Sequence, residues 1–175
     1  MSITLIVEDG SASNPDANTY ADVAFADAYH LLHGNALWAT LTTDQKNADL
    51  IAAMDFLEVN YNQRWIERRT ILTQPLAWPR VWVIDGDGFA LKANVVPIKV
   101  LKAQCELALR AAAGTLLVPD LTNPGTIKSE QVGIGGAITK TTTYSSPKSQ
   151  LASFRMVEFL LREFVNIGGS KLVRS

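Results

Sequence analysis

The sequence predicts a mainly α-helical protein: a small bundle of about four helices with a projecting β-hairpin and an extended C-terminal tail. Apolar residues recur at helical spacing in four stretches, and capping residues mark the ends of several of them. A threonine-rich segment around the glycines of 133–136 predicts the hairpin. With 175 residues, 47% hydrophobic, the chain is expected to form one domain over residues 1–167, followed by a flexible tail over 168–175.

The first helix is expected between Asp22 and His33. Asp22 is a good N-cap residue, and Gly34 is well suited to end the helix in a left-handed conformation. Helical spacing predicts a buried stripe made of Phe25, Ala28, Tyr29 and Leu32.

Two longer helices are expected in the middle of the chain. Thr42 and Gln45 fit a capping box, which predicts a helix from Thr42 to about Asn60. Pro97 is well placed at the first position of a further helix ending at Gly114. The expected core positions are Leu50, Met54, Leu57 and Tyr61 in the earlier helix, and Ile98, Leu101, Cys105, Ala108 and Ala112 in the later one.

The remaining segments carry turn signals. Residues 62–94 are expected to be irregular or extended, with a tight turn at 85–88. The hairpin is placed at about 126–144, and a last helix follows Ser146-Pro147 and ends near Asn166. Its expected buried face is Phe154, Val157, Leu161 and Phe164.

Charge is unevenly distributed along the chain, although the net charge is only −1. Residues 1–58 hold nine acids and one lysine, whereas residues 59–175 hold fifteen bases and eight acids. Such a chain can meet its own copies head to tail, which closes into a ring if the rotation permits. Folding can equally mix the two halves over one surface, and both alternatives stay open.

No pattern of catalytic, cofactor or metal-binding residues stands out, so the sequence predicts a protein that is not an enzyme. Asp27, His30 and His33 fit a surface cluster better than a metal site, because further ligands are lacking. The acidic turn at 85–88 lacks the glutamate that a calcium loop needs. Cys105, the single cysteine, excludes an internal disulfide and indicates a reducing compartment. No apolar run is long enough to cross a membrane.

A basic–aromatic run over residues 61–69 is the main candidate for nucleic-acid binding. Arg64, Arg68 and Arg69 surround Trp65, and single-stranded DNA is bound by such combinations of arginine and aromatic rings. The alternative is that the tryptophans are core or interface anchors and that the arginines pair with the acidic half of the chain.

A family resemblance rests on three segments. Pro75 and Pro79 favour an extended, surface-forming strip from Gln74 to Arg80. With Leu5–Gly10 and Asn18–Tyr20 in this order and spacing, the chain resembles a family of tailed-phage head–tail connector (adaptor) proteins. The same family is also labelled DnaT-like single-stranded-DNA-binding.

The resemblance implies a structural virion protein, made in the bacterial host cytoplasm and without catalysis or cofactors. It implies a dodecameric ring between the portal protein and a downstream neck or tail protein, with double-stranded DNA passing through the channel without sequence specificity. The alternative it carries is a single-stranded-DNA-binding replication protein. The motif positions are Asn18, Tyr20, Trp78, Pro79 and Arg80. The expected interface residues are Trp78, Arg80, Lys171, Leu172, Val173 and Arg174, and Trp78 is also expected to be a packing anchor.

Overall fold

The computed structural model describes residues 3–115, 117, 130–134, 138–142 and 154–166. Contacts divide the chain into two compact units, one made of Met1–Leu117 and Ser153–Ser175 and the other of Val118–Ala152. The described part is mainly helical with a small antiparallel hairpin, which confirms the predicted fold class.

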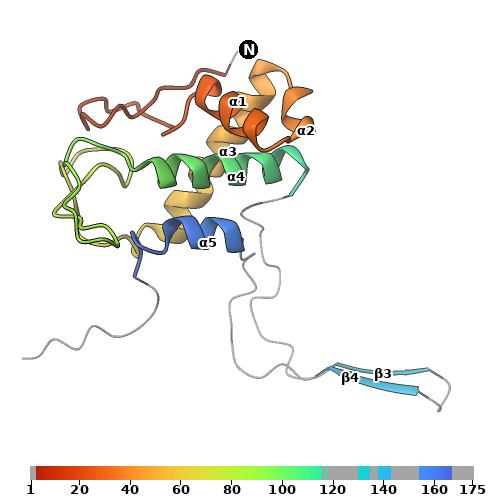
Figure 1. Ribbon diagram of the computed structural model, residues 1–175. Coiled ribbons are helices and arrows are strands. Elements are labelled where there is room, and N and C mark those ends of the chain that lie inside the picture. Colours follow the sequence, from red (N-terminus) through yellow and green to blue (C-terminus); the bar gives the residue numbers. More distant parts are fainter. Residues whose placement is uncertain (1–2, 116, 118–129, 135–137, 143–153, 167–175) are drawn as a thin grey trace, which may run out of the picture. The chain divides into compact units, whose positions relative to one another are not determined.

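All helices of the described residues belong to the first unit. In Figure 1, α1 and α2 lie on one side of α4 and α5 lies on the other, while α3 crosses α4. The short helix α2 was not expected, because four residues are too few to show a helical repeat. The helices are α1 (Val23–Leu32), α2 (Ala36–Ala39), α3 (Thr43–Tyr61), α4 (Ile98–Ala112) and α5 (Arg155–Leu161).

The predicted helix ends are confirmed where a cap defines them. The Asp22 side chain accepts a hydrogen bond of 2.7 Å from the Phe25 N–H, and Thr42 and Gln45 form the reciprocal capping box. Gly34 follows α1 at a φ of +67°. A residue with a Cβ is strained there, which explains why glycine ends this helix.

The predicted buried stripe of α1 is wrong at two positions. Ala28 and Leu32 are exposed, and Leu32 retains 85% of its accessible surface. The helix instead buries Ala26, Tyr29 and His30. The buried face is rotated because the imidazole of His30 packs against Trp38 of α2, an element that the sequence pattern did not reveal.

Helix α4 begins one residue later than expected, with Pro97 as its N-cap. Ile98, expected in the core, is 58% exposed, whereas Cys105 and Ala108 are buried as expected. The helix also buries a residue that the apolar pattern did not predict: Gln104 is polar and fully buried. Its side chain joins α4 to the N-terminal loop and to α3 through four hydrogen bonds: to Tyr20 N, Ala21 N, Thr19 Oγ1 and Leu50 O.

The expected extended surface strip at 74–80 is wrong. The chain bends at 75–77, and Leu76 to Arg80 are all buried. Gln74 holds this loop closed, because its side-chain nitrogen donates to Leu76 O at 2.8 Å and to Pro79 O at 3.0 Å. Trp78 is completely buried and lies edge-on against Trp65 and Phe164, which confirms that it is a packing anchor.

Short strands complete the described structure. In the first unit β1 (Arg68–Arg69) pairs antiparallel with β2 (Arg80–Val81), and the predicted turn at 85–88 is closed by the Asp85 N–H to Phe89 O hydrogen bond. In the second unit β3 (Glu130–Ile134) pairs antiparallel with β4 (Ile138–Thr142), which confirms the predicted hairpin; Gly133 and Ile134, expected near the turn, belong to β3.

The last helix ends earlier than expected, at Leu161 instead of near Asn166. Beyond it the chain turns and Val165 forms an antiparallel bridge with Trp65. These backbone hydrogen bonds to another segment replace those of a longer helix. The part of the predicted helix before Phe154 and the predicted tail at 168–175 lie outside the described residues.

Candidate nucleic-acid interface

Three chain segments from distant parts of the sequence lie side by side in the first unit. The central segment is 64–69, where the Ile66 N–H donates to Phe164 O at 3.0 Å and Arg64 O accepts from the Asn166 N–H at 2.7 Å. On its other edge, Arg68 faces Val81 in the β1–β2 ladder. The run identified in the sequence is therefore flanked by residues from 80–82 and from the end of α5.

Arginines and aromatic rings stack in pairs across these segments. The guanidinium carbon of Arg68 lies 4.2 Å from the ring centroid of Trp82, that of Arg162 lies 4.5 Å from Phe159, and that of Arg64 lies 4.8 Å from Tyr61. Trp82 is 66% exposed and Phe159 is 59% exposed. We call Arg64, Arg68, Arg69, Trp82, Phe159 and Arg162 the arginine–aromatic surface.

The arginines of this surface are exposed and form no ion pair within the described part of the chain. The ion pairs found there are Lys46–Asp27, Lys99–Glu163 and Arg110–Glu106. The alternative that the arginines pair with the acidic half therefore finds no ion pair at these residues, although Arg69 interacts electrostatically with Glu58 across the cavity that both line. Glu67 is an exposed acid between them, so the surface carries more positive than negative charge but is not purely basic.

Two residues beside the ladder adopt left-handed backbone conformations. Glu67, just before β1, has a φ of +57°, and Trp82, just after β2, has a φ of +62°. Such conformations cost about 1–3 kcal/mol each for residues with a Cβ, and they concentrate at functional sites. At Trp82 this backbone geometry accompanies an indole ring that stays largely in solvent.

The buried side chain of Arg80 fixes the backbone segments that carry the arginine–aromatic surface. The guanidinium of Arg80 donates to Ile66 O at 2.7 Å, to Glu67 O and to Ala77 O, so it ties the central segment to the 74–80 loop. The observed contacts of Trp78 and Arg80 are internal to the chain, and the interface role predicted for them stays a prediction.

A polar cavity of about 360 Å³ opens at one edge of this surface, between the end of α3 and the 74–80 loop. Its lining includes Glu58, Asn62, Arg68, Arg69 and Arg80. Burial raises the pKa of Glu58, although the carboxylate accepts hydrogen bonds from the Ala77 N–H and the Tyr20 hydroxyl.

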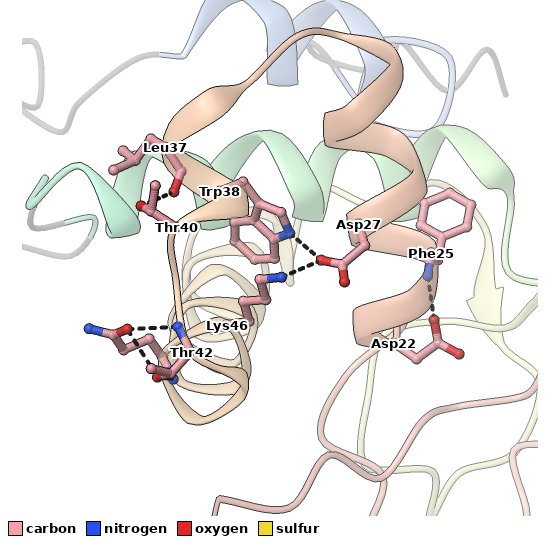
Figure 2. A network of polar contacts seen from close by, with 9 residues as sticks. Asp22, Phe25, Asp27, Leu37, Trp38, Thr40, Thr42 and Lys46 are labelled. Carbon is pink, nitrogen blue, oxygen red and sulfur yellow. Dashed lines mark hydrogen bonds and ion pairs between the residues drawn. The ribbon is translucent and has the colours of Figure 1, made fainter.

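The Asp27, His30 and His33 group is not a surface cluster, because His30 is buried and its Nδ1 lies 3.0 Å from the side-chain nitrogen of Asn35. Figure 2 shows that Asp27 accepts hydrogen bonds from the Trp38 indole nitrogen at 2.7 Å and from Lys46 Nζ at 2.8 Å. The described residues contain no group of three or more His, Cys, Asp or Glu side chains able to hold a metal ion.

The motif residues Asn18 and Tyr20 make contacts within the chain. Tyr20 is buried, and its hydroxyl accepts a hydrogen bond of 3.0 Å from the Trp78 N–H, which joins two of the motif segments. The Asn18 side chain holds the N-terminal segment through Ile6 N and Thr4 O. The predicted tail residues Lys171, Leu172, Val173 and Arg174 lie outside the described residues.

The sequence identified the central segment but not its flanks. Trp82 was grouped with the other tryptophans as an anchor, and Phe159 and Arg162 were assigned to a helix without a binding role. The i, i+3 spacing of Phe159 and Arg162 allows the two side chains to meet on one helix, and this spacing is the sequence feature that could have indicated their pairing.

The fold and this surface define a small, mainly helical protein whose exposed arginines stack on aromatic rings. A family model described as "Putative DnaT-like ssDNA binding protein" matches residues 3–175. The chain belongs to this family. No match was found among curated proteins or among solved structures. Within the described residues, no helix is both long and apolar enough to span a bilayer.

Proposed function

We propose that the protein binds single-stranded DNA through the arginine–aromatic surface. Arg64, Arg68 and Arg162 contact phosphates, while Trp82 and Phe159 provide faces on which unpaired bases stack. The observation that carries this proposal is the pair of exposed rings, Trp82 and Phe159, each stacked with an exposed arginine that forms no ion pair in the described residues. The family description supports the same function.

The proposed mode of binding is local and independent of base sequence. The chain as a whole has a net charge of −1, so long-range attraction to DNA is weak and binding depends on this one surface. Contacts to three or four phosphates would give a slope of log affinity against log salt of about −2 to −3, from roughly 0.7 per contact on single strands.

The experiment is a fluorescence titration with single-stranded oligonucleotides at several salt concentrations. The oligonucleotide carries a dye whose anisotropy is the reporter, so wild type and the Trp82→Ala variant are measured in the same way. In wild type the emission of Trp82, the exposed tryptophan of the four in the chain, is a second reporter. Trp82→Ala is expected to weaken binding by about 1–3 kcal/mol, the usual contribution of one stacked base. Arg68→Ala is expected to weaken binding and to reduce the salt slope by about 0.7.

Lys102→Ala is the matched control for the charge change. Lys102 lies on α4 and makes no hydrogen bond or ion pair in the described structure, so its removal lowers the charge by the same amount away from the surface. Equal losses for Arg68→Ala and Lys102→Ala, or an unchanged affinity of Trp82→Ala, would show that the arginine–aromatic surface is not the binding site.

A second candidate function is the head-to-tail ring of a virion connector that docks on the portal protein and joins it to the tail. Among the exposed large apolar side chains, two groups lie far apart in the sequence: Leu31 and Leu32 at the end of α1, and Trp82, Ile84 and Phe89 around the 85–88 turn. A ring subunit needs two different contact faces, and two distinct apolar groups supply candidates for them.

Native mass measurement tests this second candidate. The ring proposal expects a discrete closed oligomer, twelve subunits by the family resemblance, that Leu31→Ser/Leu32→Ser converts to smaller species. Both leucines are largely in solvent, so the substitutions are expected to leave the subunit folded. A wild-type monomer at all concentrations, alone and with portal protein, would rule the ring out.

A further inference from the structure

A cavity of about 360 Å³ lies in the first unit, beside the start of α1. The N-terminal loop, the start of α1 and the residues around the start of α4 form its walls. The lining combines three carboxylates with apolar side chains and contains no lysine, arginine or histidine. Its residues are Val7, Glu8, Asp9, Tyr20, Asp22, Phe25, Asn94, Val95, Val96 and Leu101.

Glu8 gives this cavity its unusual chemistry. The residue is only 3% exposed, and Oε1 accepts hydrogen bonds of 2.9 Å from the backbone N–H groups of Gly10 and Ala12. Oε2 is buried and has no hydrogen-bond partner in the described structure. A buried carboxylate oxygen without a partner is costly, so a cationic donor would be favourable there.

The other two carboxylates belong to the exposed residues Asp9 and Asp22. Asp9 Oδ1 accepts from the Ser11 N–H at 2.8 Å, and Asp22 Oδ1 accepts from the Phe25 N–H at 2.7 Å. In each case one carboxylate oxygen is held by a backbone N–H. The described residues hold no group of three such side chains able to bind a metal ion, so a cationic side chain on a long apolar stem suits the cavity better than an ion.

We propose that this cavity binds the segment Lys171–Arg174 of this protein. The segment reads Lys-Leu-Val-Arg, two cations around two aliphatic side chains. The cations match the three carboxylates, and Leu172 and Val173 match the aliphatic part of the lining. The segment lies outside the described residues, and the proposal does not depend on DNA binding.

The test uses full-length protein in which the segment itself is disabled by Lys171→Glu/Arg174→Glu. A fluorescent peptide of residues 168–175 is added, and its binding is followed by anisotropy. We expect the peptide to bind this variant, to bind wild-type protein more weakly because the native segment competes, and to dissociate as salt rises. Adding Glu8→Gln/Asp22→Asn is expected to weaken binding about tenfold or more.

The pocket substitutions are chosen to preserve the fold. Glutamine at position 8 keeps an oxygen for Gly10 and Ala12, and asparagine at position 22 is an equally good N-cap. Asp16→Asn/Asp55→Asn is the control, because both residues are exposed, lie outside the cavity and remove the same charge. The proposal is overturned if the peptide does not bind, if the pocket and control variants bind it equally, or if a scrambled peptide of the same composition binds as well.

Discussion

Replacing the buried amide of Gln104 with methionine tests how the N-terminal loop is attached to the helices. The side chain keeps its length, but its two donors and its acceptor are lost. Gln104 Oε1 is the acceptor for the Tyr20 N–H at 3.1 Å and for the Ala21 N–H at 2.9 Å, and neither has another partner in the described structure. Both amides would be left buried and unsatisfied.

The size of the effect follows from these groups. Each buried N–H without a partner costs about 1–3 kcal/mol, so the two together predict a loss of roughly 2–6 kcal/mol. Thr19 Oγ1 still donates to Ala21 O at 2.8 Å, so it adds little to the loss. A domain of this size has about 5–15 kcal/mol of stability, which makes the expected loss a large share of the total.

Urea unfolding followed by circular dichroism measures the loss. Gln63→Met is the matched control, because Gln63 is exposed and makes no hydrogen bond in the described structure. The control is expected to lie within about 0.5 kcal/mol of wild type. A Gln104→Met protein that loses less than about 1 kcal/mol would show that the two amides find other partners and that the reasoning is wrong.

Three further predictions follow from buried groups. Trp78→Ala is expected to lose about 3–5 kcal/mol in the same assay, and an unchanged melting temperature would contradict the packing role of Trp78. Because burial raises the folded-state pKa of Glu58 above its unfolded value near 4.5, the contribution of Glu58 to stability should be greatest below that value and be lost as pH rises through the folded pKa. The difference in stability between wild type and Glu58→Gln, measured by urea unfolding between pH 4 and 8, should therefore change with pH in this direction, and a difference that does not vary with pH would contradict the burial effect. Burial also raises the pKa of Cys105 to about 12, so a disulfide reagent at pH 8 should react with it only after unfolding, and rapid reaction of the native protein would show that the thiol is accessible.

Sequence reasoning succeeded where the signal was local. The ends of α1 and α3 were predicted because Asp22, Thr42 and Gln45 satisfy N–H groups only three residues away. It failed where a residue's environment is made by distant segments. Gln104 contacts residues 83 to 85 positions earlier, and no pattern within α4 distinguishes it from a solvent-facing glutamine.

In the candidate site, too, only the part that is continuous in the sequence was predictable. The run at 61–69 was visible as a pattern of arginines and aromatic residues, but its flanks come from the segment after β2 and from α5. Whether an arginine is paired with a carboxylate depends on the fold, and here Arg64, Arg68 and Arg162 form no ion pair in the described part of the chain.

The motif residues and the proposed binding residues occupy different layers of the molecule. Tyr20 accepts from the Trp78 N–H, and Arg80 donates to the backbone of Ile66 and Glu67, so the motifs form an internal frame directly beneath the arginine–aromatic surface. Substitutions of these buried residues would disturb the arginine–aromatic surface, although the residues themselves would not contact a ligand. Family resemblance carried by the frame therefore argues strongly for the fold, whereas the ligand has to be established with exposed residues such as Arg68 and Trp82, whose removal leaves the frame in place.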